Sequence, residues 1–148
     1  MADRQTVIVT GASQGIGAAI VRAFLDRGYN IVATARNMSS AAFAPSPNLA
    51  FVDGDITQQS TSDQIAQAAI SKFGSIHHLI NNAGIFFSKP FTDYTIDDFR
   101  RLVSINLEGF IHITQRATWQ MLSQGVGGSV TTITAALVDN PGAEAPLP

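Results

Sequence analysis

The feature that most limits the fold of this chain is an apolar segment followed by a glycine-rich turn and a helical pattern. Residues 6–10 are the apolar segment, and residues 11–17 read Gly-Ala-Ser-Gln-Gly-Ile-Gly. Apolar side chains then recur at the i, i+3, i+4 spacing of one helix face: Ile16, Ala19, Ile20, Ala23 and Phe24. Gly28 follows where a left-handed C-cap is expected. The sequence therefore predicts a strand, a glycine turn and a helix.

A turn of this kind is suited to bind a pyrophosphate. Glycines allow a tight turn, a close approach of backbone amides to phosphate, and close packing of helix against strand. The helix N-terminus adds unpaired N–H groups and the positive end of the helix dipole. A glycine-rich turn between two buried elements, without a ligand, is the alternative interpretation. The spacing G-x-x-x-G-x-G also differs from the more common G-x-G-x-x-G.

Residues 10–17, Thr-Gly-Ala-Ser-Gln-Gly-Ile-Gly, resemble the T-G-x-x-x-G-I-G segment of the short-chain dehydrogenase/reductase family. The resemblance implies an α/β fold of the Rossmann type, with a doubly wound parallel sheet in the strand order 3-2-1-4-5. It also implies that a nicotinamide dinucleotide is bound by this segment, through Gly11, Ser13, Gln14, Gly15, Ile16 and Gly17.

Length and composition agree with one globular domain. The chain has 148 residues, of which 45% are hydrophobic and 14% charged, as in α/β proteins and unlike disordered chains. A net charge of −2 predicts no nucleic-acid partner, and the lack of cysteine excludes disulfides and a thiol nucleophile. The three histidines have no metal-ligand spacing, so no metal is expected. Without a secretory leader or a long apolar run, we expect a soluble cytoplasmic protein.

The second strand, expected at residues 30–35, ends at the position that selects the coenzyme. In dinucleotide folds an acidic residue there binds the ribose of NAD, and a nearby basic residue favours the 2′-phosphate of NADP. Here Ala35 is followed by Arg36, which favours NADP(H) over NAD(H). NAD(H) remains an alternative coenzyme for two reasons. Arg36 could be a solvated side chain, and Gln14 stands where relatives that prefer NADP often carry a basic residue.

Two further segments resemble the family. A third strand at residues 49–52 leads into Asp53-Gly54-Asp55-Ile56-Thr57, which is similar to the family's D-V-T segment and implies that Asp55 and Ile56 touch the adenine. Asp55 could equally form an Asx turn or a helix cap. A fourth strand, residues 76–80, ends in the family's N-N-A-G motif, and the resemblance places Asn82, Ala83 and Gly84 beside the cofactor. Adjacent amides at a strand end also predict a defined polar network.

The second half of the chain predicts more helix. We expect a helix over residues 58–73 closed by Gly74, a helix capped by Thr95, and a long helix over residues 103–123. One stripe of the long helix is expected to be apolar, with Trp119 packed as well: Leu107, Phe110, Ile111, Thr114, Thr118, Met121 and Leu122. By resemblance, Asn106 is the asparagine of the family's catalytic tetrad. A tolerated polar residue on a solvated face is its alternative interpretation.

The family pattern breaks after the fifth strand, expected at residues 129–134. The serine that orients the substrate carbonyl is replaced by Ala135, with Thr134 the nearest hydroxyl. The catalytic tyrosine would fall on Pro148, and the sequence has no Y-x-x-x-K motif. The sequence therefore predicts a single dinucleotide-binding domain over residues 1–148 that lacks the C-terminal strands of the family.

Three functional interpretations follow. In the first, the chain is the cofactor-binding part of an oxidoreductase that interconverts carbonyl and alcohol substrates. In the second, it is a non-catalytic NADP(H)-binding regulatory module. In the third, it binds a partner protein through an open sheet edge. Because family members pair through their long helices, a homo-oligomer is expected, without nucleic-acid or membrane partners.

Overall fold

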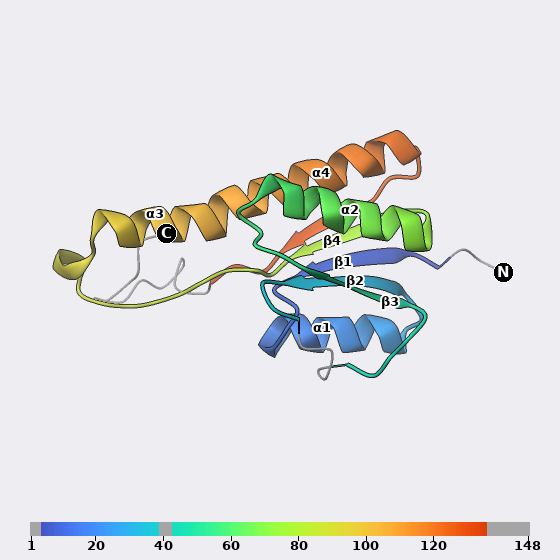
Figure 1. Cartoon of the computed structure of the whole chain (residues 1–148), viewed down its shortest axis with the longest axis horizontal. Helices are drawn as coiled ribbons and strands as arrows, with labels where there is room; N and C mark the ends of the chain where they lie inside the picture. The colour runs from blue at the N-terminus through green and yellow to red at the C-terminus, as the bar shows by residue number, and fades with distance from the viewer. Residues whose placement is uncertain (1–3, 39–42, 136–148) are drawn as a thin grey trace.

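A computed structural model describes residues 4–38 and 43–135 of the chain. At its centre is a parallel sheet of five strands in the order β3-β2-β1-β4-β5 (Figure 1). Its strands are β1 (Thr6–Thr10), β2 (Asn30–Ala35), β3 (Leu49–Asp53), β4 (His78–Asn81) and β5 (Ser129–Thr132). The predicted strand order 3-2-1-4-5 is thus confirmed. Because the strands are parallel, their carboxyl ends meet at one edge of the sheet.

Helices cover both faces of the sheet (Figure 1). Helix α1 (Gly15–Asp26) lies on one face, and α2 (Gln59–Phe73) and α4 (Gly109–Gln124) lie on the other. Every residue of β1 is buried, and its side chains alternate between the two layers: Val7 and Val9 pack on the α1 side and Ile8 on the α2 and α4 side. This burial on both faces explains why the strand is an unbroken apolar run.

The glycines that were expected to end helices do so. Gly28, Gly74 and Gly125 all have positive φ; Gly74 and Gly125 directly follow their helices, and Gly28 lies two residues after the last residue of α1. The helix predicted at Thr95 is α3 (Ile96–Val103), preceded by the short helix η2 (Phe91–Asp93). Thr95 and Asp98 form a reciprocal capping box at its start. Figure 1 shows α3 extending beyond the carboxyl edge of the sheet.

The apolar face assigned to α1 is partly wrong. The residues that this helix buries are Gly17, Ala18 and Val21, whereas Ala19 is exposed and Ile16 is 60% exposed. Small residues face the sheet because α1 begins in close contact with the turn after β1. Ile16 lies one position before Gly17, about 100° around the helix, and falls outside this buried face.

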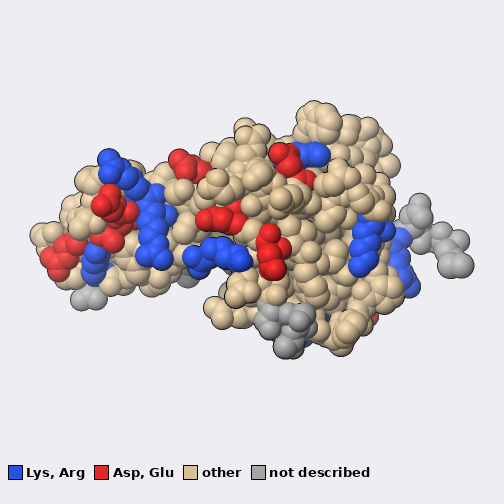
Figure 2. All heavy atoms as spheres, viewed as in Figure 1, with Lys and Arg blue, Asp and Glu red and all other residues tan. Residues whose placement is uncertain are grey.

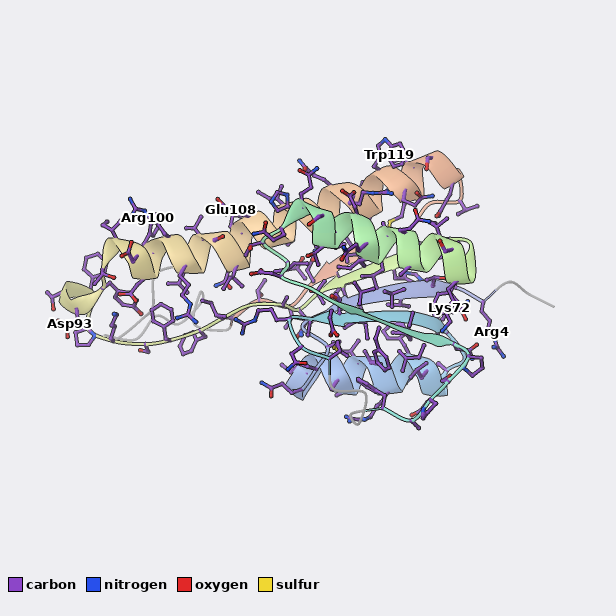
Figure 3. All side chains as sticks on the ribbon, in the orientation of Figure 1. Arg4, Lys72, Asp93, Arg100, Glu108 and Trp119 are labelled. Atoms are coloured by element: carbon purple, nitrogen blue, oxygen red, sulfur yellow. The ribbon has the colours of Figure 1, made fainter. Side chains whose placement is uncertain are left out.

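The stripe predicted for the long helix is also displaced. Helix α4 buries Ile113, Ala117 and Met121, and of these only Met121 was predicted. Three residues assigned to the stripe are exposed: Leu107, Ile111 and Leu122. Trp119 is 63% exposed and stands out from α4 (Figure 3). The buried ridge has i, i+4 spacing and begins at Gly109, where a Cβ would lie 2.7 Å from Ile56 Cγ2. That close contact sets the rotation of the helix.

Strands β4 and β5 differ at their ends from the prediction. Strand β4 begins at His78 rather than at residue 76, and β5 stops at Thr132 rather than at residue 134. Ile76 is buried, but its backbone N–H and C=O both bond the side-chain amide of Gln124, each at 2.8 Å. This pairing with α4 replaces strand pairing at that position. None of the helices built from the described residues is long and apolar enough to cross a membrane.

Candidate functional site

A cleft of about 620 Å³ lies at the carboxyl edge of the sheet. Its walls come from the segments that follow β1, β2, β3 and β4, together with Ile105. Most predicted cofactor-binding residues line this cleft: Gly11, Ser13, Gln14, Gly15, Ile16, Arg36, Asp55, Ile56, Asn82, Ala83 and Gly84. Arg4 and Lys72 mark the opposite, amino edge of the sheet (Figure 3). Four segments that are far apart in sequence therefore meet at one site.

The first turn of α1 has the properties of an anion site. Gln14 is its N-cap, but no side chain caps the first N–H groups and the first turn holds no acidic residue. Gly15 lines the cleft with φ +56°, and a Cβ at this position would meet nothing within 4 Å. A ligand can therefore approach the backbone closely at Gly15, and the helix dipole favours an anionic ligand. These residues fit the pyrophosphate of a dinucleotide.

Gly17 is the one predicted residue of the glycine turn that does not line the cleft. It is buried, and a Cβ there would lie 2.3 Å from the Gly11 carbonyl oxygen and 2.6 Å from Asn82 Nδ2. Its role is therefore to let α1 pack against the turn. Asn82 Nδ2 donates to the carbonyl oxygens of Thr10 and Gly11 at 3.0 and 3.1 Å, which fixes the turn from the neighbouring strand.

Thr10 is a site residue to which the sequence analysis gave no role. Its hydroxyl oxygen accepts hydrogen bonds from the backbone N–H groups of Asn82 and Ala83, both at 3.0 Å. Asn81, next to them, donates from Nδ2 to Thr114 Oγ1 at 2.9 Å. The predicted polar network at the end of β4 is therefore present, but Thr10 at the end of β1 is at its centre.

Other cleft residues missed from the sequence also lie next to the motifs: Thr34, Asn37, Gly54, Ile85 and Ile105. The signal that could have found most of them is position, because the parallel topology brings the residues flanking each strand end to the same edge. Ile105 had no such signal, since it lies on a helix.

Asp55 forms the Asx turn that was one interpretation of it, and its contact with adenine stays a prediction. It lines the cleft, and its Oδ1 accepts the N–H of Thr57 at 3.0 Å, which is an Asx turn. Arg36 follows the end of β2, is exposed and lines the cleft. Among the described residues, no carboxylate forms an ion pair with Arg36. Figure 2 shows basic and acidic side chains interspersed on the face it displays, without a continuous basic field.

The predicted catalytic residues lie outside the cleft lining. Asn106 lies in a π-helical segment, η3 (Ser104–Glu108), between α3 and α4. Its side-chain amide pairs with the backbone of Ile85, accepting from the N–H at 2.9 Å and donating to the C=O at 3.1 Å. Thr134 is exposed and does not line the cleft. Pro148, the expected tyrosine position, lies outside the described residues. No group of residues that could hold a metal ion occurs within 4–38 and 43–135.

The parallel sheet, the uncapped helix and the cleft together define a protein with the Rossmann-type fold, which is typical of dinucleotide-binding proteins. The model of the short-chain dehydrogenase family matches residues 5–146, and the chain belongs to this family. One similar protein is an uncharacterised oxidoreductase of Staphylococcus epidermidis, 32% identical over 126 residues, which are 83% of this chain and 55% of the relative. Another is the NADP-dependent (R)-specific alcohol dehydrogenase of Lentilactobacillus kefiri, 29% identical over 143 residues, or 91% and 57% of the two chains.

Solved structures agree with this assignment. The crystal structure of a short-chain dehydrogenase/reductase from Brucella melitensis superposes with a TM-score of 0.84 at 26% identity, over 95% of this chain and 60% of that one. A short-chain dehydrogenase from Streptomyces avermitilis gives a TM-score of 0.83 at 28% identity, over 91% and 50%. The chain thus spans about half to three-fifths of the length of these relatives.

Proposed function

We propose that this chain is the cofactor-binding part of an oxidoreductase that interconverts a carbonyl and an alcohol. The observation that carries the proposal is the uncapped first turn of α1, which opens on the cleft at Gly15. Gly11, Ser13 and Gln14 would hold the pyrophosphate, and Asp55 and Ile56 the adenine. When bound, a nicotinamide coenzyme supplies or accepts the hydride. Asn82 and Thr10 keep the turn in shape beneath it.

Asn106 is proposed as the tetrad asparagine. Its side chain fixes the backbone of Ile85, a cleft residue, so it orders the wall through which a substrate would approach. The π-helical segment supports this role, because such segments are frequent at functional sites. Thr134 is the hydroxyl nearest in sequence to the position of the missing serine.

The coenzyme is proposed to be NADP(H) in preference to NAD(H). Arg36 lines the cleft directly after Ala35, so no carboxylate at the end of β2 opposes a phosphate. A guanidinium can bind a phosphate with two parallel hydrogen bonds. The relative from Lentilactobacillus kefiri, described as NADP-dependent, supports the same choice.

Arg36→Asp should weaken NADPH binding about tenfold, because it removes a charge-assisted contact and adds repulsion. NADH binding should change by less than about twofold, since NADH has no 2′-phosphate. Fluorescence titration of the 148-residue chain with each coenzyme measures both values. Arg4→Asp makes the same charge change at the far edge of the sheet and serves as the control. Equal losses for both coenzymes, or NADH binding as tight as NADPH binding in the wild type, would contradict the role of Arg36.

We expect the 148-residue chain to bind NADPH without sustained turnover. A methyl group at Ala135 cannot donate a hydrogen bond to a carbonyl, and the sequence contains no Y-x-x-x-K motif to transfer the proton. The test follows NADPH absorbance with a panel of aldehydes and ketones, on samples already shown to bind NADPH. Steady oxidation of NADPH would disprove this expectation.

The alanine at position 135, where the family carries a serine, also supports a second candidate function. In that case the chain is a non-catalytic NADP(H)-binding regulatory module.

We also propose that the protein is cytoplasmic and that two copies of the chain associate there. The exposed apolar side chains of α4, among them Trp119 and Leu122, support pairing of two copies, because large exposed apolar surfaces commonly mark interfaces. Light scattering coupled to size exclusion should give a mass of at least twice 15.7 kDa. A monomer at micromolar concentration would contradict this part of the proposal.

A further inference from the structure

The segment after β2 is held at both ends by two consecutive residues, Asp53 at the end of β3 and Gly54 directly after it. Gly54 N–H donates to the carbonyl oxygen of Ala35 at 3.0 Å, next to the paired residues Ala35 and Asp53. Three residues further on, the backbone N–H of Met38 donates to Asp53 Oδ1 at 2.6 Å. The Met38 side chain is 8% exposed and belongs to the core on the α1 side. Arg36 and Asn37, between the two anchors, both line the cleft.

We infer that Asp53 is a positioning residue for coenzyme selection, which holds the backbone at Met38 and thereby presents Arg36 to the 2′-phosphate of NADP(H). The inference rests on the proposed function. Asp53 does not itself line the cleft, so it acts through the backbone. A charge-assisted hydrogen bond to an N–H is stronger than a neutral one. Holding the turn in the bound shape reduces the ordering cost when the guanidinium contacts a phosphate.

The same carboxylate has a second effect of opposite sign. Its negative charge opposes a phosphate nearby, although solvent screens it because Asp53 is exposed. The two effects are separated by Asp53→Asn, which keeps an oxygen that accepts the Met38 N–H but removes the charge. Asp53→Ala removes both the hydrogen bond and the charge.

The experiment titrates the 148-residue chain and both variants with NADPH and with NADH. We expect Asp53→Ala to weaken NADPH binding about fivefold and to change NADH binding by less than about twofold. Asp53→Asn should bind NADPH within about twofold of the wild type, or more tightly. The inference is wrong if Asp53→Ala binds NADPH as tightly as the wild type, or if it loses affinity for NADPH and NADH equally. It is also wrong if Asp53→Asn loses as much affinity for NADPH as Asp53→Ala does.

A second measurement tests the hydrogen bond between the Met38 N–H and Asp53 Oδ1 directly. Hydrogen exchange of the Met38 amide, followed by NMR, should be slow in the wild type and in Asp53→Asn and fast in Asp53→Ala. Fast exchange in the wild type would overturn the inference alone. A wild-type chain that binds neither coenzyme would overturn the proposed function and this inference together.

Discussion

Replacing Gly15 with alanine should weaken NADPH binding about thirtyfold, whereas Gly28→Ala should leave binding unchanged. A Cβ at Gly15 would meet no protein atom within 4 Å, and Gly15 lines the cleft where, under the proposed function, the backbone comes close to the pyrophosphate. Loss of one charge-assisted hydrogen bond costs about 1.5–3 kcal/mol, which corresponds to roughly 10- to 150-fold in affinity. Fluorescence titration with NADPH measures the difference.

Gly28 is a matched control for Gly15. The two residues have φ of +56° and +83°, and a Cβ at either would meet nothing within 4 Å. Each alanine therefore carries a left-handed strain of about 1–2 kcal/mol without a clash. Thermal unfolding should show equal losses of stability, so only their places at opposite ends of α1 distinguish them. Similar NADPH affinities for the two variants would show that phosphate does not bind at this turn.

Thr10→Val should lower the free energy of unfolding by about 2–4 kcal/mol, because it leaves two backbone N–H groups without their acceptor. The Thr10 hydroxyl is that acceptor for Asn82 and Ala83, and Thr10 is 1% exposed. Valine has nearly the same shape, so packing changes little. Urea unfolding followed by circular dichroism measures the change.

Thr6, at the other end of β1, tests whether loss of the hydrogen bonds is the cause. It is 0% exposed, and its hydroxyl has no hydrogen-bond partner. Thr6→Val removes an unsatisfied polar atom, so stability should stay the same or rise by up to about 1 kcal/mol. Equal destabilisation by the two substitutions would indicate that β1 does not tolerate valine at its ends. It would contradict the explanation that Thr10→Val acts through the lost hydrogen bonds.

Local signals accounted for most elements of the fold. The apolar run of β1, the turn that begins α1 and the glycines that end the helices depend on neighbours in sequence. The faces of α1 and α4 did not follow from such signals. Hydrophobicity alone placed Ile16 and Leu122 inward, but the close contacts of Gly17 with Gly11 and of Gly109 with Ile56 decide which side of each helix faces the sheet.

The sequence by itself determined the strand–turn–helix unit, the resemblance to one family and eleven of the eighteen residues that line the cleft, because these depend on short motifs at strand ends. Only the tertiary structure decided the hydrogen bonds of Thr10 and Asp53. Each acts across strands, Thr10 on the backbone after β4 and Asp53 on the backbone after β2. Such pairings depend on which strands become neighbours, which no single segment of the chain encodes.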